Sequence, residues 1–395
     1  MLKRRSKFNV LNDSTSFGRN PADFGLLGVA VVLVLMGLIM VYDASVVHAY
    51  KDFGDKYFYV RQQSIWVVLG FFCLFLFSKF KYSYLKIFSL PMFLVSILML
   101  LAVHIPGLGV DAGGAHRWLN LGFVAIQPAE IVKLTTIIFF ATLFDKQSFP
   151  TDKHSFPTDK HSLTLSDKKI RLMPFLLTVV GITGILGILQ KDLGSAIVFF
   201  LTMTGFYVIS GAPLKPILYG APIAAITSLL LVILYPHRIA RVKAFIDPFS
   251  DTQGNSYHIA QVLIALGSGG ITGLGIGQSR QKFEYIPEVT TDSIFAIVGE
   301  ELGFIGSVFL ISLLSFLVYR GFKIAERVDD HFGKLLAYGL TMWLGIQTLV
   351  NLAAMVSLIP LTGVPLPFIS YGGSALLVNL VAVGILANIS KSAHK

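Results

Sequence analysis

The sequence has little charge and almost no cysteine. Only 14% of its 395 residues are Asp, Glu, Lys or Arg, whereas a soluble globular domain has about 25%. This leaves no room for a separate soluble domain. The single cysteine, Cys73, lies in an apolar run. Because there is only one cysteine, an intramolecular disulfide is excluded and the redox compartment stays undetermined.

Long apolar segments fill most of the chain. Hydrophobic residues make up 54% of it, and runs long enough to cross a bilayer recur from end to end. The sequence therefore predicts an all-α polytopic membrane protein whose helices form one domain over 24–390. No small-residue cleavage site ends the first run, so we expect a retained helix and not a signal peptide. The expected spans are ten in number: 24–44, 64–79, 86–104, 126–144, 173–190, 194–211, 217–235, 292–319, 335–358 and 374–390.

The distribution of Lys and Arg predicts the orientation. Of the 32 such residues, 21 lie in the tails and the even-numbered connections, 10 in the odd-numbered connections, and Lys133 within a span. Because basic residues favour the cytoplasm, the tails 1–23 and 391–395 are expected there. The cytoplasmic side would also hold the linker 145–172, with its tandem repeat SFPTDKH. The large extracytoplasmic loop 236–291, between helices seven and eight, would face outward. The net charge of +10 thus indicates membrane orientation and not a nucleic-acid partner.

Four outward segments mix Gly, Pro, aromatic and charged residues. These are 113–134, 190–196, 241–292 and 360–375. Such residues favour backbone that is neither helix nor strand, which survives at membrane depth only around protein or a water-filled cavity. We therefore expect an outward polar cavity roofed by these segments, with ordinary surface loops as the alternative. The glycines between 267 and 277 lack the spacing and preceding strand of a nucleotide loop.

Carboxylates cluster where the eighth span begins. Asp292 is expected in its first turn, either as an N-terminal cap or as a chemical group. The helix dipole would lower its pKa and burial would raise it, and the sequence does not decide between them. Glu300 lies about 80° around the helix from Asp292, and Glu301 lies on the opposite side. Because ionised carboxylates are costly inside a membrane, at least one should face the bundle interior.

Cations are predicted near the same outer end. Lys133, within the fourth span, costs about 2.5–3.5 kcal/mol to insert, and Glu130 lies on the same helix face. This pair either locks helices together or has a functional role. With Arg117, Arg280 and Lys282, it would give an outward cavity both a base and phosphate-binding cations. A lipid-linked sugar pyrophosphate fits this arrangement, and so does a transported anion.

Several segments of this chain resemble the SEDS family of shape, elongation, division and sporulation proteins, represented by FtsW and RodA. The resemblance covers about 24–390. It is carried by RWLNLGFVAIQPAEIVKL, by Asp247 to Gln261, by YIPEVTTDSIFAIVGEELGF and by TGVPLPFISYGGS. GIGQSRQKFEYIPE is closer to the FtsW branch. The resemblance implies a peptidoglycan glycosyltransferase that polymerises lipid II at the outer face of the cytoplasmic membrane, during cell division, and releases undecaprenyl diphosphate.

The family's functional residues fall on particular positions of this chain. Its essential aspartate falls on Asp292, and two family glutamates fall on Glu284 and Glu288. The arginine of its Arg-Trp motif falls on Arg117, and the lysine after Gln-Pro-x-Glu falls on Lys133. We expect Asp292 to be the base. Arg117, Lys133 and Lys282 would hold the donor pyrophosphate, with a divalent cation (Mg or Mn) and no organic cofactor. Glu284 and Glu288 would position the acceptor or bind the metal.

The chain departs from the family pattern at several positions. Thr290 and Ser293 stand where a histidine and a phenylalanine are usual, and Lys191 replaces a proline. Ser357 and Ala375 replace a usual glycine and serine. These changes affect the local shape around Asp292 but remove no charged site residue.

The resemblance also implies partners. They are a class B penicillin-binding protein (a transpeptidase) and divisome proteins at the septum. Three alternatives remain open: a lipid II flippase, a RodA-type elongation polymerase, and a scaffold with no chemistry.

Overall fold

The structure is a computed structural model. It describes residues 20–112, 115–120, 122, 124–145, 165–212, 220, 236–249, 251, 254, 256–283 and 285–394. The tandem repeat, Glu284 and nearly all of the predicted span 217–235 lie outside the described residues.

Helices account for most of the described chain, as predicted for an all-α membrane protein. Six of them are long and apolar enough to cross a membrane: α1, α2, α3, α10, α11 and α12 with the turn that follows it. Three more predicted spans, 126–144, 173–190 and 194–211, coincide with α4, α5 and α6. The helices are α1 (Phe24–Phe53), α2 (Phe58–Lys79), α3 (Tyr84–Ala102), α4 (Pro128–Asp145), α5 (Leu165–Gly184), α6 (Leu193–Ile209), α8 (Pro236–Ile246), α9 (Tyr257–Ser268), α10 (Ile294–Arg327), α11 (His331–Met355) and α12 (Gly373–Ile389).

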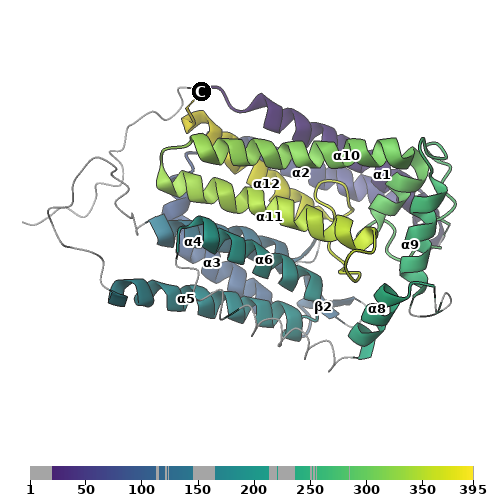
Figure 1. Ribbon diagram of the computed structural model, residues 1–395, viewed down its shortest axis with the longest axis horizontal. Helices are drawn as coiled ribbons and strands as arrows, with labels where there is room; N and C mark the ends of the chain where they lie inside the picture. The colour runs from purple at the N-terminus through teal and green to yellow at the C-terminus, as the bar shows by residue number, and fades with distance from the viewer. Residues whose placement is uncertain are drawn as a thin grey trace, which may run out of the picture.

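The helix α12 lies at the centre of the bundle, packed against α2 (Figure 1). Its sequence is apolar on every side, and nearly all of its residues are buried, which is typical of a helix surrounded by protein. Small residues allow the close approach: a Cβ on Gly384 would lie 2.7 Å from the backbone oxygen of Leu74. By contrast, Val68 and Phe72 of α2 are exposed, as expected for a face that contacts lipid.

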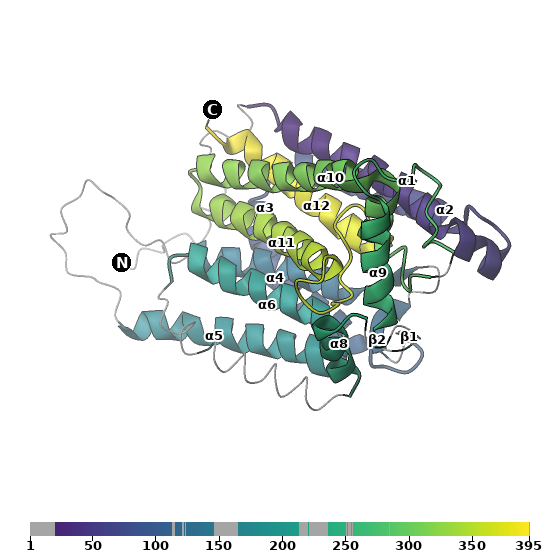
Figure 2. The ribbon, with the colours of Figure 1, turned by 45° about the vertical axis from the view of Figure 1, so that its right-hand side comes forward.

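The two described ends of the chain meet at one end of the bundle, which we call the terminal end. Asn20 Nδ2 donates to the backbone oxygen of Ala393 at 2.6 Å, and the Asp23 amide donates to Ser390 Oγ at 3.0 Å. The expected even number of spans would place the two ends together in this way. The other end, which we call the outer end, carries α8, α9 and a small sheet (Figure 2).

The connections at the outer end contain more regular structure than the sequence analysis predicted. Strands β1 (Gly109–Ala112), β2 (Ala115–Asn120) and β3 (Ala125–Ile126) form an antiparallel sheet in the order β1-β2-β3. The large loop contains α8 and α9. The expectation of backbone that is neither helix nor strand was therefore wrong for much of 113–134 and 241–292, whereas 360–372 contains neither helix nor strand. Buried backbone groups need hydrogen-bond partners, and short strands and helices supply them. The Gly and Pro content of a segment does not reveal such short elements.

A break in α10 joins this helix to the large loop. Gly303 has φ 64° and ψ −163°, which interrupts the helical hydrogen bonds. The loop supplies the missing partners. The amides of Leu274 and Gly275 donate to the carbonyls of Glu300 and Glu301, each at 3.0 Å. In return, the amides of residues 304 and 305 donate to the carbonyls of residues 270 and 271. Backbone hydrogen bonds in both directions thus fix the outer loop to α10 at the break.

We predict that Gly303→Ala destabilises the protein markedly. The residue has a left-handed φ, and an added Cβ would lie 2.3 Å from the Gly273 nitrogen, so backbone strain of about 1–3 kcal/mol adds to a steric clash. The midpoint of thermal unfolding in a single detergent should fall. Gly28→Ala is the matched control, because no atom lies within 4 Å of its added Cβ; its midpoint should stay or rise. Equal midpoints for the two variants would contradict the role of the break.

Candidate functional site

Asp292 lies just before α10, whose N-terminal cap is Ser293. The prediction that Asp292 lies within the first helical turn was therefore wrong, because Asp292 precedes the capping residue. Its side chain is 8% exposed. Thr291 Oγ1 lies 3.2 Å from Asp292 Oδ1 and 3.0 Å from Glu288 Oε2. This hydroxyl therefore lies between the two carboxylates. On another side, a Cβ added to Gly363 would lie 3.7 Å from Asp292 Oδ2.

Burial decides the ionisation of Asp292. It raises the pKa of this carboxyl to about 6, and the negative charge of Glu288 adds to the increase. Hydrogen bonds from its own backbone amide and from Thr291, and then the charge of Arg241, oppose it. The sequence left this balance open. A carboxyl with a pKa near 6 is still mostly ionised at pH 7 and is a stronger base than an ordinary aspartate.

Hydrogen bonds from two other elements fix the backbone around Asp292. Asn351 Nδ2, on α11, donates to the carbonyls of Asp292 at 2.9 Å and Val364 at 2.7 Å. The Tyr371 amide donates to the carbonyl of Thr290 at 2.8 Å. The segment 288–293 is thus held between α11 and the last outer loop, and all the groups involved are buried or nearly so.

His258 and Arg241 belong to this site but were not among the predicted site residues. His258 Nε2 lies 2.7 Å from Ser293 Oγ, so the hydroxyl of Ser293 faces His258 and makes no capping bond. Burial, aided by the charge of Arg241, lowers the pKa of His258 to about 4, which keeps the imidazole neutral at pH 7. His258 lies in YHIAQ, which the resemblance had singled out, but its partner Ser293 is 35 residues away.

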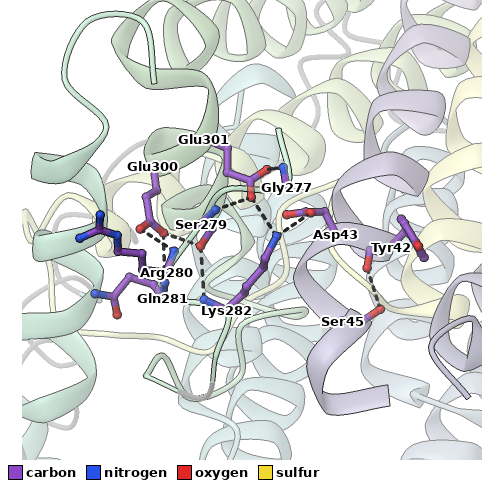
Figure 3. A network of polar contacts seen from close by, with 10 residues as sticks. All are labelled: Tyr42, Asp43, Ser45, Gly277, Ser279, Arg280, Gln281, Lys282, Glu300 and Glu301. Carbon is purple, nitrogen blue, oxygen red and sulfur yellow. Dashed lines mark hydrogen bonds and ion pairs between the residues drawn. The ribbon is translucent and has the colours of Figure 1, made fainter. Parts of the chain in front are cut away.

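Glu300 and Glu301 both hold the outer loop in place (Figure 3). Glu300 accepts hydrogen bonds from the Ser279 hydroxyl and the Arg280 amide. Glu301 accepts hydrogen bonds from the amides of Gly277 and Ser279, at 3.1 and 2.9 Å. Both side chains are 1% exposed, which confirms that at least one faces the interior. They serve the same loop, so the expectation that Glu301 would face away from the others was wrong.

Lys282 joins this network to α1. Its Nζ donates to Asp43 Oδ1 at 2.9 Å and to Glu301 Oε1 at 3.3 Å. Burial alone would lower the pKa of the Lys282 ammonium, but Asp43 and Glu301 together raise it above its usual value. Lys282 is therefore a charged group already paired with carboxylates.

Lys133 is fully enclosed between α4 and α11. Its Nζ donates to Glu130 Oε1 and to Gln347 Oε1, both at 2.7 Å, and lies 5.3 Å from the centre of the Trp343 ring. The pairing with Glu130 that the sequence predicted is present. Gln347 also donates to the Pro365 carbonyl at 3.2 Å, so this network supports the last outer loop close to Asp292.

Arg117, on β2, reaches the turn before α6. Its Nη2 donates to the Lys191 carbonyl at 3.0 Å. The next turn residue, Asp192, is within 3.5 Å of Gln127 Nε2, and a Cβ on Gly194 would lie 2.3 Å from the Thr362 oxygen. Since Gly363 adjoins Asp292, the last outer loop lies between the Arg117 turn and the acid. Of the predicted site residues, Asp292 and Glu288 thus lie next to each other, whereas Arg117 lies on the far side of the last outer loop.

The described residues contain no group of three His, Cys, Asp or Glu side chains placed to hold a metal ion. A cation at the site would therefore have few protein ligands there. Magnesium often binds through one or two carboxylates and the phosphates of a substrate, and Glu288 and Asp292 would suffice for that. A small cavity of about 20 Å³ lies beside Arg241, between α8, α9 and residues 357–361.

Comparisons with known proteins agree on one family. The family model FTSW_RODA_SPOVE, described as a cell cycle protein, matches residues 25–395. Among curated relatives, a probable peptidoglycan glycosyltransferase FtsW from Geobacter sp. (strain M18) is 35% identical, over 93% of this chain and 96% of the relative. Stage V sporulation protein E from Bacillus subtilis (strain 168) is also 35% identical, over 93% and 97%.

Solved structures share the fold. One, from a study on structural coordination of polymerization and crosslinking by a peptidoglycan synthase complex, has a TM-score of 0.73 and 25% identity. The match covers 95% of this chain and 99% of that one. The rod shape determining protein RodA of Thermus thermophilus has a TM-score of 0.66 and 24% identity, over 95% and 98%.

We predict that Lys133→Met destabilises the protein by about 3–5 kcal/mol, because it leaves Glu130 buried without its cation. The double variant Glu130→Leu/Lys133→Met should recover most of this stability. In it, Gln347 Oε1 keeps its hydrogen bond from Trp343 Nε1, which is 2.9 Å in length. Thermal unfolding of the single and double variants in one detergent tests the pair. A double variant as unstable as Lys133→Met would contradict this interpretation.

Proposed function

The chain belongs to the FtsW/RodA/SpoVE family, and we propose that it is a peptidoglycan glycosyltransferase that polymerises lipid II into glycan strands. The observation that carries the proposal is Asp292: a buried carboxyl whose pKa is about 6, held at the outer end of an apolar bundle. Relatives that bear this activity in their names match over 93% of the chain. A scaffold would not require a carboxyl in this environment.

In the proposed mechanism, Asp292 removes the proton from the 4-hydroxyl of the acceptor's terminal GlcNAc. The resulting oxygen attacks C1 of the donor MurNAc, a new C1–O bond forms, and the bond from C1 to the diphosphate oxygen breaks with inversion. The electron pair leaves with undecaprenyl diphosphate. The raised pKa suits the step, because a base works best when its pKa approaches the working pH. Glu288 raises this pKa further and is exposed, so it could contact the acceptor sugar.

Arg117 is the best candidate to hold the departing diphosphate. Among the described residues, no carboxylate lies within salt-bridge distance of its guanidinium, whose Nη2 binds a carbonyl. Arg241 is a second such cation, because its Nη1 binds the Leu361 carbonyl at 3.2 Å and its charge acts on Asp292. Lys133 and Lys282 would have to exchange carboxylate partners to bind the diphosphate, so their role in this proposal is secondary.

A divalent cation, Mg or Mn, completes the proposed site. When bound, it would neutralise charge on the departing diphosphate. Glu288 and Asp292 are the described carboxylates that could hold it, and Glu284 is a further candidate by resemblance. No organic cofactor is part of the proposal.

The setting that we propose is a bacterial cytoplasmic (inner) membrane, at the division septum. The tails would face the cytoplasm, as the Lys and Arg distribution favours, and the outer end would face the periplasmic side. A class B penicillin-binding protein and divisome proteins would be the partners. This is supported by the likeness to a structure from a study of a peptidoglycan synthase complex. A RodA-type role in elongation and a lipid II flippase remain the alternatives.

We predict that Asp292→Asn abolishes glycan strand formation from lipid II by the purified chain, with or without its transpeptidase. The amide keeps the shape of the side chain but cannot accept the proton. Glu326→Gln is the matched control, because this carboxylate is exposed at the other end of α10, and it should polymerise at the wild-type rate. Strands formed by Asp292→Asn at that rate would refute the base. Transbilayer movement of lipid II in liposomes without polymer from the wild type would favour the flippase.

The pH dependence gives a further prediction. Asp292 must be ionised to act, so activity should rise with pH through about 6 and be lost as pH falls below it. Because the charge of Glu288 raises the pKa of Asp292, Glu288→Gln should move this acidic limb to lower pH. Initial rates at saturating lipid II between pH 4.5 and 8 test this. A limb that stays in place, or moves upward, would show that Asp292 is not the group that titrates.

A further inference from the structure

A cavity of about 320 Å³ lies at the terminal end of the bundle, at the opposite end of α10 from Asp292. It is formed by the residues that lead into α1, by the last two turns of α10 and by the residues that follow α12. Ligand pockets in proteins have volumes of about 300–1,000 Å³. This one is therefore large enough for a small polar group and not only for water. Its lining comprises residues 20–25, Arg320, Lys323, Ile324, Arg327, Ser390, Ala393 and His394.

Three cations of α10 line this cavity. Arg320, Lys323 and Arg327 are spaced i, i+3 and i+7, which places them on one face of the helix. Arg320 is neutralised by Asp23, which accepts hydrogen bonds from both its Nε and its Nη2. Lys323 Nζ donates to the Tyr319 hydroxyl at 3.3 Å and lies 5.6 Å from the centre of the same ring.

Two of these charges lack a carboxylate. Among residues 20–394 that the structure describes, no Asp or Glu oxygen lies within 4 Å of the charged groups of Lys323 or Arg327. The other titratable group of the lining, His394, is paired with Asp329. The start of α1 also faces the cavity, and the positive end of its dipole adds to the field. The cavity thus has a net positive potential.

The position of the cavity indicates the kind of ligand. It lies at the C-terminal end of the 34-residue helix α10, which is long and apolar enough to cross a membrane, so this end is expected near a membrane surface. Phe24 is 73% exposed and Tyr319 is 53% exposed beside it, and exposed aromatic residues are typical of the boundary between lipid tails and headgroups. The preference of Lys and Arg for the cytoplasmic side of a membrane explains why cations lie at this end of the bundle. It does not explain why they line a cavity.

We propose that this cavity binds the phosphate of an anionic phospholipid headgroup, with Lys323 and Arg327 as its charged donors. Basic pockets between helices at a membrane surface suit such headgroups. Asn20 Nδ2 and Ser390 Oγ already make hydrogen bonds within the protein, so the two cations are the groups that would hold the phosphate. The phosphate chemistry is shared with free inorganic phosphate, but only a lipid would place acyl chains along the exposed apolar face beside Phe24. The inference does not depend on the proposed glycosyltransferase activity.

The test measures binding of phosphatidylglycerol to the purified full chain by native mass spectrometry, from a detergent that holds the protein folded. We expect Lys323→Gln/Arg327→Gln to weaken the first bound lipid about tenfold or more. Lys334→Gln is the matched control: this cation lies in the first turn of α11, at the same end but outside the cavity, and it should bind as the wild type does. Phosphatidylcholine should bind weakly to all three.

Each outcome decides the matter. Equal loss in Lys334→Gln would mean that the charge of the whole surface attracts the lipid, and would overturn the site. Undiminished binding by the double variant would overturn it as well. Inorganic phosphate that displaces phosphatidylglycerol at low millimolar concentration would point to a free anion as the natural ligand. The unfolding midpoints of all variants are measured without lipid, so that a folding defect is recognised. If the double variant is misfolded, lipid binding by the single variants Lys323→Gln and Arg327→Gln tests the site.

Discussion

The outer half of the molecule depends on one requirement: buried polar groups near the break in α10 must be paired. The break at Gly303 frees backbone groups that water cannot reach, and Glu300 and Glu301 bring two further carboxylates into the interior. The loop 270–282 supplies partners for them, and an unpaired buried group costs about 1–3 kcal/mol. The loop is therefore anchored to α10 just before it leads into Asp292. Glu300 and Glu301 are thus explained as anchors of the loop, whereas Asp292 is the proposed base.

A second set of contacts makes the site sensitive to residues that never reach a substrate. Gln347 binds Lys133 and the Pro365 carbonyl, whereas Asn351 binds the carbonyls of Asp292 and Val364. These two residues are one turn apart on α11, a rise of about 6 Å. Displacement of the buried pair Glu130–Lys133 would therefore reach the acid through α11 and the last outer loop. Loss of activity on replacing Lys133 is thus no proof of contact with a phosphate, because a supporting role gives the same result.

The features of this structure that could be predicted are those that depend on residues close together in the sequence. Apolar runs predicted the helices, although α1 continues to Phe53, well past the expected residue 44. The pair Glu130–Lys133 was visible at a spacing of three. By contrast, Lys282 and Asp43 lie 239 residues apart and His258 and Ser293 lie 35 apart. No period or spacing reveals such partners, because tertiary packing brings them together.

The environment of Asp292 shows how one residue of register changes chemistry. Had Asp292 been the N-terminal cap or a first-turn residue, the free amides and the dipole of α10 would have stabilised its charge and weakened it as a base. The cap is Ser293 instead, and its hydroxyl faces His258. Asp292 thus lies outside the helix, close to Glu288 and away from bulk water, where its charge is costly. The sequence contained every residue of this arrangement, but the raised pKa follows from the burial of Asp292 and the nearby charge of Glu288, which only the tertiary structure reveals.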